Sequence, residues 1–123
     1  MKRLLVADDA MIIREMIKDA AAMAGWEVVG EASDGAVAIE RYEELKPDAV
    51  TLDLVMPQFD GLHALRGIMQ KDPAAKVVIV SAVNQAKLLK DAIALGASDF
   101  IVKPFDRPTI ANALARLASA RAK

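Results

Sequence analysis

The chain has 123 residues, a length that fits one domain burying roughly two-thirds of its unfolded surface. A composition of 54% hydrophobic and 27% charged residues excludes a disordered chain. The 16 basic and 17 acidic residues are interspersed and give a net charge of -1, so no basic surface for nucleic acid or anionic membranes is indicated. Without cysteine there are no disulfides, and no targeting or transmembrane segment stands out. We therefore expect one cytoplasmic, monomeric domain with no membrane insertion.

Five short segments rich in valine, isoleucine and leucine recur along the chain. They are Arg3–Ala7, Glu27–Ala32, Ala49–Leu54, Lys76–Ser81 and Asp99–Lys103. Most are continuously apolar rather than alternating, which is typical of strands that are covered on both faces.

Segments with helical spacing lie between and after these strands. Their apolar residues recur at positions 13, 16, 17 and 20; 38, 39, 42 and 45; 62, 65, 68 and 69; 88, 89, 92 and 93; and 110, 114 and 117. Gly25, Pro47, Pro73 and Gly96 predict the ends of the first four helices. Ser33 and Asp106 are the predicted N-caps of the second and fifth helices, and Pro108 is tolerated in the first turn of the fifth.

Strand and helix thus alternate five times with short connections. This pattern predicts an α/β fold, a doubly wound parallel five-stranded sheet with helices on both faces and right-handed crossovers. We find no linker or internal repeat in residues 1–123 and expect a single domain with no output domain.

Polar residues follow the apolar segments where ligands bind in such sheets, at the carboxyl ends of the strands. Asp8 and Asp9 follow the first strand, Asp53 ends the third, Ser81 the fourth and Lys103 the fifth. Three carboxylates brought together would repel one another unless a cation joins them. Mg²⁺ is the expected ion, because it accepts a few carboxylates and keeps several waters.

A metal, a lysine and a hydroxyl around one carboxylate suit an anionic phosphoryl group. Asp53 would be the nucleophile, since carboxylates form acyl phosphates, and the backbone carbonyl of Val55 could complete the metal shell. Each residue alone also has an ordinary structural explanation; Asp8 and Asp9, for instance, could cap the first helix. The coincidence of suitable residues at four strand ends favours the site.

The sequence resembles the receiver domains of two-component response regulators. The resemblance is carried by VADD (6–9), LDLVMPQFDG (52–61), VSA (80–82) and GASDFIVKPF (96–105), and it spans essentially the whole chain. It is strongest to short, stand-alone CheY-type chemotaxis regulators, and it implies the flavodoxin-like (βα)5 fold with strand order 2-1-3-4-5.

The resemblance implies roles for these residues. Asp53 would accept phosphate from a sensor histidine kinase, and Asp8 and Asp9 would organise Mg²⁺ with Asp53 and the Val55 carbonyl. Lys103 would pair with the phosphoryl oxygens, and its bond to Pro104 is often cis in the family.

Further implied roles concern the switch and its lifetime. Ser81 stands where the family more often has threonine. Phe100 occupies the switch position, although an aromatic residue in a strand could also simply belong to the core. Val55 and Val83 occupy positions that tune loss of the phosphoryl group; both are apolar, so we expect a long-lived phosphorylated form.

The implied function is a signalling switch that catalyses its own phosphorylation and a slow autodephosphorylation. Its output would be a protein-binding surface on helix 4, strand 5 and helix 5, with the flagellar motor or a phosphotransfer domain as target. Alternatives are a phosphorelay intermediate, a receiver excised from a longer protein, a flavin-binding protein and a phosphohydrolase. The paired acids after the first strand disfavour a flavin phosphate, and no separate general acid or base is apparent for hydrolysis.

Overall fold

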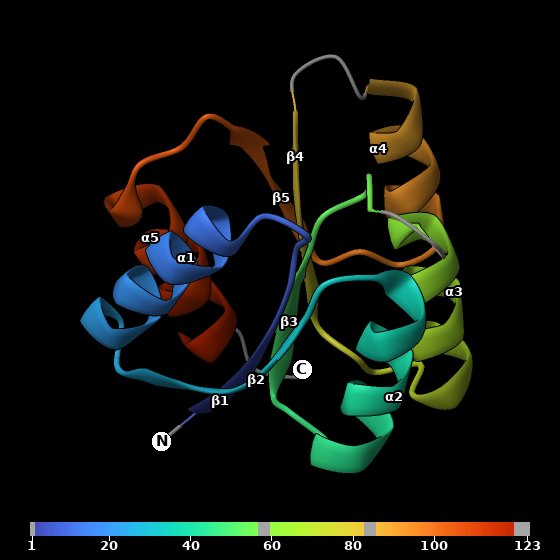
Figure 1. The fold of residues 1–123 in the computed structure, drawn as a ribbon, viewed down its shortest axis with the longest axis horizontal. Helices are drawn as coiled ribbons and strands as arrows, with labels where there is room; N and C mark the ends of the chain where they lie inside the picture. The colour runs from blue at the N-terminus through green and yellow to red at the C-terminus, as the bar shows by residue number, and fades with distance from the viewer. Residues whose placement is uncertain (1, 57–59, 83–85, 120–123) are drawn as a thin grey trace.

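The computed structural model describes residues 2–56, 60–82 and 86–119 as a single sheet flanked by helices (Figure 1). The strands are β1 (Lys2–Ala7), β2 (Trp26–Ala32), β3 (Ala49–Leu52), β4 (Val77–Ala82) and β5 (Asp99–Lys103). The helices are α1 (Met11–Met23), α2 (Gly35–Leu45), α3 (Gly61–Lys71), α4 (Ala86–Ala94) and α5 (Arg107–Ser119). Every predicted element is present, with ends that shift by one or two residues.

The sheet has the order β2-β1-β3-β4-β5, and all neighbouring strands pair in parallel. Figure 1 shows α1 and α5 on one face and α2, α3 and α4 on the other. The flavodoxin-like fold predicted from the sequence is confirmed.

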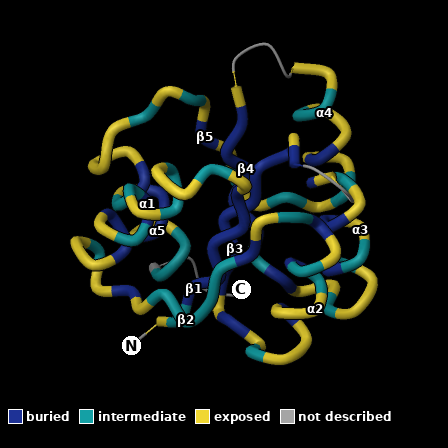
Figure 2. Tube along the Cα trace, in the orientation of Figure 1, coloured by how far each residue is buried: buried dark blue, intermediate teal, exposed yellow. Residues whose placement is uncertain are grey.

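Side chains alternate between two hydrophobic cores, one on each face of the sheet. Leu4 and Val6 of β1 pack with the α1 and α5 side, whereas Leu5 packs with the α2, α3 and α4 side. All four residues of β3 are buried, and this strand lies in the dark interior of Figure 2. The apolar strands read as continuous in the sequence because both of their faces are covered.

Local signals in the sequence explain most of the helix ends. Gly25 and Gly96 have φ values of 79° and 112°, which L-residues with side chains rarely adopt. Asp106 accepts a hydrogen bond from the Thr109 amide at 3.0 Å, as expected of the N-cap of α5.

The N-cap of α2 differs from the prediction. Asp34, rather than Ser33, accepts a hydrogen bond from the Val37 amide at 2.9 Å. The C-cap of the same helix is Lys46, which has a φ of 47° and stands directly before Pro47. Because Pro47 disfavours helical backbone in the residue before it, α2 ends at Leu45.

The third strand is shorter than predicted. It ends at Leu52 rather than Leu54, so Asp53 is the first residue beyond it. Across the described residues, none of the helices combines the length and apolar character needed to cross a bilayer.

Candidate functional site

Backbone hydrogen bonds between neighbouring strands position the carboxylates at the carboxyl edge of the sheet. The Asp8 amide donates to the Ala32 carbonyl at 2.9 Å, and the Asp53 amide donates to the Ala7 carbonyl at 3.0 Å. The parallel register therefore continues for one residue past the ends of β1 and β3. Asp8 and Asp53 are carried on the rigid part of the fold, although each lies just outside a strand.

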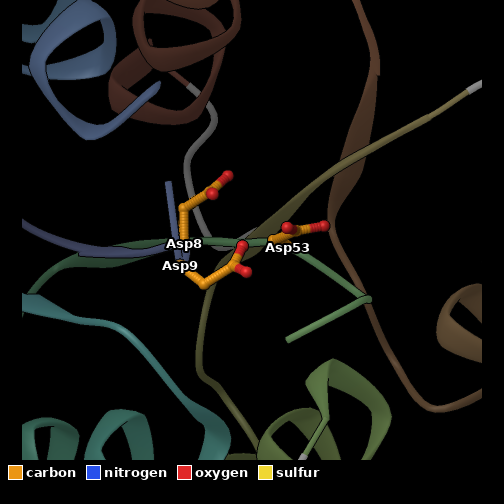
Figure 3. Close-up of side chains that lie close together, drawn as sticks. All are labelled: Asp8, Asp9 and Asp53. Carbon is orange, nitrogen blue, oxygen red and sulfur yellow. The ribbon is translucent and has the colours of Figure 1, made fainter. Parts of the chain in front are cut away.

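Asp8, Asp9 and Asp53 lie close together at this edge (Figure 3). One carboxylate oxygen from each lies within 4.8 Å of the others. Asp8 is 1% exposed and Asp53 5% exposed, whereas Asp9 is exposed to solvent. The three carboxylates expected from the sequence to meet do meet.

Helix capping does not explain these acids. The N-cap of α1 is Ala10, which makes no side-chain capping bond, and the Asp8 Oδ1 atom accepts instead from the Ala10 amide at 2.9 Å. The other carboxylate oxygen of Asp8, Oδ2, is buried and has no hydrogen-bond partner within the described part of the chain. Such an oxygen is available to a cation.

Lys103 is the cation that the fold brings to this cluster. Its Nζ lies 3.0 Å from Asp8 Oδ2 and 3.2 Å from Asp53 Oδ2. The contact with Asp8 is an ion pair without hydrogen-bond alignment, since the same Asp8 oxygen makes no hydrogen bond. One lysine thus stands against three carboxylates, and the cluster keeps an excess of negative charge.

Burial and this excess charge perturb two groups in the cluster. Burial, followed by the charge of Asp8, raises the pKa of Asp53, and Lys103 offsets this only in part. For Lys103, burial lowers the pKa, but Asp8 and Asp53 outweigh it and the pKa is raised. Lys103 is therefore cationic, and the Asp53 carboxylate is destabilised until a further cation arrives.

The donor set fits Mg²⁺. All three side chains offer hard oxygen ligands, their charge is under-compensated, and the exposed side of Asp9 leaves room for retained waters. The Val55 amide donates to Asp53 Oδ1 at 3.2 Å, so Val55 folds back towards the acid. The assignment of its carbonyl as a fourth ligand stays a prediction.

The remaining predicted residues lie in different settings. Ser81 is 2% exposed at the end of β4 and pairs with Val102 of β5. Phe100 is 43% exposed on β5, so the interpretation of this residue as a core aromatic is wrong. Val83 lies outside the described residues. The peptide bond between Lys103 and Pro104 is cis, as the resemblance implied.

Gly61 shapes the site in a way that the sequence did not reveal. Its amide donates to the Leu54 carbonyl at 3.0 Å, and a Cβ at Gly61 would meet the carbonyl oxygen of Asp53 and the Cα of Leu54. In the sequence, Gly61 stands out only as the last residue of LDLVMPQFDG (52–61), directly before the third segment with helical spacing. No local pattern distinguishes a glycine that begins a helix from one that lets two backbones touch.

The residues of this site and the strand order together point to one family. The model of the response regulator receiver domain matches residues 4–115. The chain belongs to the response regulator receiver domain family. Receiver domains are signalling switches, which is the function class that the sequence predicted.

Individual relatives agree in length as well as in sequence. The chain is 51% identical to the chemotaxis protein CheY of Listeria monocytogenes over 118 residues, covering 96% of this chain and 99% of that protein. It is 49% identical to the CheY of Thermotoga maritima over 113 residues, covering 92% and 94%.

Solved structures show the same architecture. A chain of the CheX–CheY–BeF3–Mg²⁺ complex from Borrelia burgdorferi matches with a TM-score of 0.90 and 31% identity, covering 97% of this chain and 90% of that one. The relatives named here are CheY proteins, and the comparisons do not favour the phosphorelay alternative.

Proposed function

We propose that this receiver domain is a phosphorylation-operated switch of the chemotaxis type and that Asp53 is its phosphoacceptor. The observation that carries the proposal is the position of Asp53. Its carboxylate is nearly buried, points into an acidic cluster and lies 3.2 Å from the Lys103 ammonium. Similarity to stand-alone chemotaxis regulators over 96% of this chain supports the chemotaxis role and an action as one domain.

The proposed reaction is transfer from a phosphohistidine of a sensor kinase. An oxygen of Asp53 attacks phosphorus and forms an acyl phosphate, while the P–N bond breaks and its electron pair returns to the imidazole, which takes a proton from water. The cofactor, Mg²⁺, would be held by Asp8, Asp9, Asp53 and the Val55 carbonyl. When bound, Mg²⁺ neutralises charge on the phosphoryl oxygens.

The chain's own residues would do the rest. Lys103 already contacts Asp53 and would follow the new negative charge, whereas Ser81, at the adjoining strand end, would donate its hydroxyl to a phosphoryl oxygen. Movement of Ser81 would be coupled to the exposed ring of Phe100 on β5. The output would be a change in the surface of α4, β5 and α5, read by a downstream protein such as a flagellar motor component in the cytoplasm.

The test uses acetyl phosphate and Mg²⁺ with intact-mass detection of the phosphorylated chain. The wild type should gain the mass of one phosphoryl group, and Asp53→Asn should gain none. Asp91→Asn on α4 is the matched control, because Asp91 is an exposed acid far along the chain from the cluster. Equal uptake by wild type and Asp53→Asn would reject the proposal.

The lifetime of the phosphorylated form follows from two apolar residues. Val55, which is 51% exposed, and Val83 cannot orient an attacking water by hydrogen bonding. We expect Val83→Glu or Val83→Asn to accelerate decay of phospho-Asp53, measured by the loss of the added mass after removal of the donor. An unchanged decay rate would contradict this assignment.

A further inference from the structure

Arg14 on α1 donates a hydrogen bond to the backbone of Asp8 and has no role in the proposed phosphoryl transfer. Its Nη1 donates to the Asp8 carbonyl at 2.8 Å, and its Nε donates to Glu31 Oε1 of β2 at 2.8 Å. The Arg14 side chain is 17% exposed, less than either partner in its ion-pair chain. A half-buried guanidinium with two short, charge-assisted bonds has a well-fixed orientation.

The anchor of Arg14 is itself fixed. The other oxygen of Glu31, Oε2, accepts from Lys18 Nζ at 3.0 Å. Burial would raise the pKa of Glu31, but the hydrogen bonds from Lys18 and Arg14 outweigh it and lower the pKa. Glu31 therefore remains an anion and holds the guanidinium between β2 and the start of α1.

The hydrogen bond from Arg14 to the Asp8 carbonyl also restrains the backbone of Asp9. A peptide group is planar, so fixing the Asp8 carbonyl fixes the amide nitrogen of Asp9 in the same plane. The Asp8 amide is already bonded to Ala32, and the N-cap of α1 has no side-chain capping bond. Arg14 thus completes the restraint of the peptide that joins the two metal-binding acids.

Asp9 is the member of the cluster that needs this restraint. It is exposed, whereas Asp8 and Asp53 are buried and contact Lys103. An exposed side chain is directed chiefly by the backbone from which it projects. Residues that orient metal ligands in this way affect affinity without touching the ion.

We infer that Arg14 is a positioning residue for the metal site, fixing the Asp8–Asp9 peptide so that both carboxylates face the same cation. The inference rests on the proposed function, because it assumes that the cluster binds Mg²⁺. It concerns affinity for the ion and leaves the phosphoryl transfer itself to Asp53 and Lys103.

The experiment compares three variants of the whole chain by calorimetric titration with Mg²⁺ alone. Arg14→Met removes both hydrogen bonds and keeps the apolar stem, and Arg14→Lys keeps the charge but lacks the fork that spans Asp8 and Glu31. Lys18→Met is the matched control, because it removes a bond to Glu31 Oε2 but leaves both direct bonds of Arg14, to Glu31 Oε1 and to the Asp8 carbonyl, in place. We expect the Mg²⁺ dissociation constant to rise about tenfold in Arg14→Met and about threefold or more in Arg14→Lys. In Lys18→Met it should stay within about twofold.

A second measurement separates positioning from a general loss of stability. In the metal-free protein, the amide NMR signals of Asp9 and Ala10 should shift in Arg14→Met and stay in place in Lys18→Met. Equal Mg²⁺ affinity in the two variants would overturn the inference, and if Arg14→Met does not fold, an unchanged affinity in Arg14→Lys would do so. A wild type that binds no Mg²⁺ would instead overturn the proposed metal site, and this inference with it.

Discussion

The two ends of the sheet can be compared group by group. At the amino end, the Arg3 amide donates to Asp48 Oδ2 at 2.8 Å, and the Tyr42 hydroxyl donates to Asp72 Oδ2 at 2.6 Å. The Arg3 side chain also reaches the last carbonyls of α2, at Leu45 and Lys46. Asp48 and Asp72 thus each accept a hydrogen bond.

At the carboxyl end, Lys103 stands against Asp8, Asp9 and Asp53, and Asp8 Oδ2 lacks a hydrogen bond from any described residue. The fold thus gives the acids Asp48 and Asp72 hydrogen-bond donors at one end of the sheet, and leaves the three acids at the other end, where we propose that a cation and an anion bind, under-compensated. Proteins accept unfavourable electrostatics at reactive sites when the rest of the domain is stable enough to hold them. The variants below test that difference, beginning with the largest effect.

Of these variants, Gly61→Ala should lower the unfolding free energy most. Its new Cβ would meet backbone atoms of Asp53 and Leu54, which cannot move as a side chain can, so we expect a loss of about 3 kcal/mol in unfolding free energy. Gly67→Ala, in the same helix, is the control. Its Cβ would meet the Cδ1 atom of Ile39 at 2.5 Å, and this flexible side chain can shift. Urea unfolding should show Gly67→Ala within about 1 kcal/mol of the wild type.

Lys103→Met should cause the second largest loss of stability. Removing this cation leaves Asp8 and Asp53 facing each other, at a cost of about 2 kcal/mol, below the full value for buried pairs because the lysine side chain is 22% exposed. Added Mg²⁺ should stabilise Lys103→Met more than the wild type, because the competing positive charge is gone. Thermal unfolding with and without Mg²⁺ measures both effects.

The control for Lys103→Met lies at the other end of the sheet. Lys71 pairs with Glu43 at 3.2 Å in an exposed setting, so Lys71→Met should change stability by less than about 0.5 kcal/mol. A similar response of the two lysine variants to Mg²⁺ would contradict the difference between the ends.

Tyr42→Phe tests the hydrogen bonding at the amino end of the sheet. Burial, followed by the hydrogen bond to Asp72, raises the pKa of Tyr42, so its hydroxyl is a stable donor. Loss of that donor should lower the unfolding free energy by about 1 kcal/mol. Phosphate uptake and Mg²⁺ affinity should be unchanged, and a fall in either would show that the two ends are coupled.

Asp53→Asn should change stability in the opposite direction. Because burial and Asp8 raise the pKa of Asp53, the folded state binds a proton more tightly than the unfolded state does. Wild-type stability therefore falls, relative to Asp53→Asn, as the pH rises from about 4 through the raised pKa. In metal-free buffer near neutral pH we expect Asp53→Asn to be more stable than the wild type. Denaturation curves across this pH range would contradict the prediction if the difference did not grow with pH.

Most of the fold could be predicted from the pattern of strands and helices in the sequence. The continuous apolar segments predicted the strands, and Gly25 and Gly96 predicted two of the helix ends. Both features depend on only a few neighbouring residues, so they can be recognised in the sequence. Asp34 is the N-cap of α2, whereas Ser33 was predicted; both residues can accept the capping bond, and only the path of the chain decides between them. The left-handed backbone at Lys46 could not be expected from a lysine.

The site was predictable for a related reason. Asp8, Asp53, Ser81 and Lys103 interrupt apolar strands at the edge where parallel strands end together, so topology alone gathers them. Arg14 and Gly61 do not interrupt an apolar strand, so their roles could not be predicted in this way. Their contacts with the Asp8 and Asp53 backbones depend on how α1 and α3 dock onto the sheet, which no spacing in the sequence encodes.

The complete burial of β3 has a consequence for timing. A central strand with all four residues buried and partners on both sides should exchange its amide hydrogens only through global unfolding, at the slowest rates in the molecule. Asp53, the proposed phosphoacceptor, is thus attached directly to the part of the chain that opens least often. Under the proposed function, the phosphorylation of Asp53 would therefore be transmitted by side chains that rearrange around a stationary backbone.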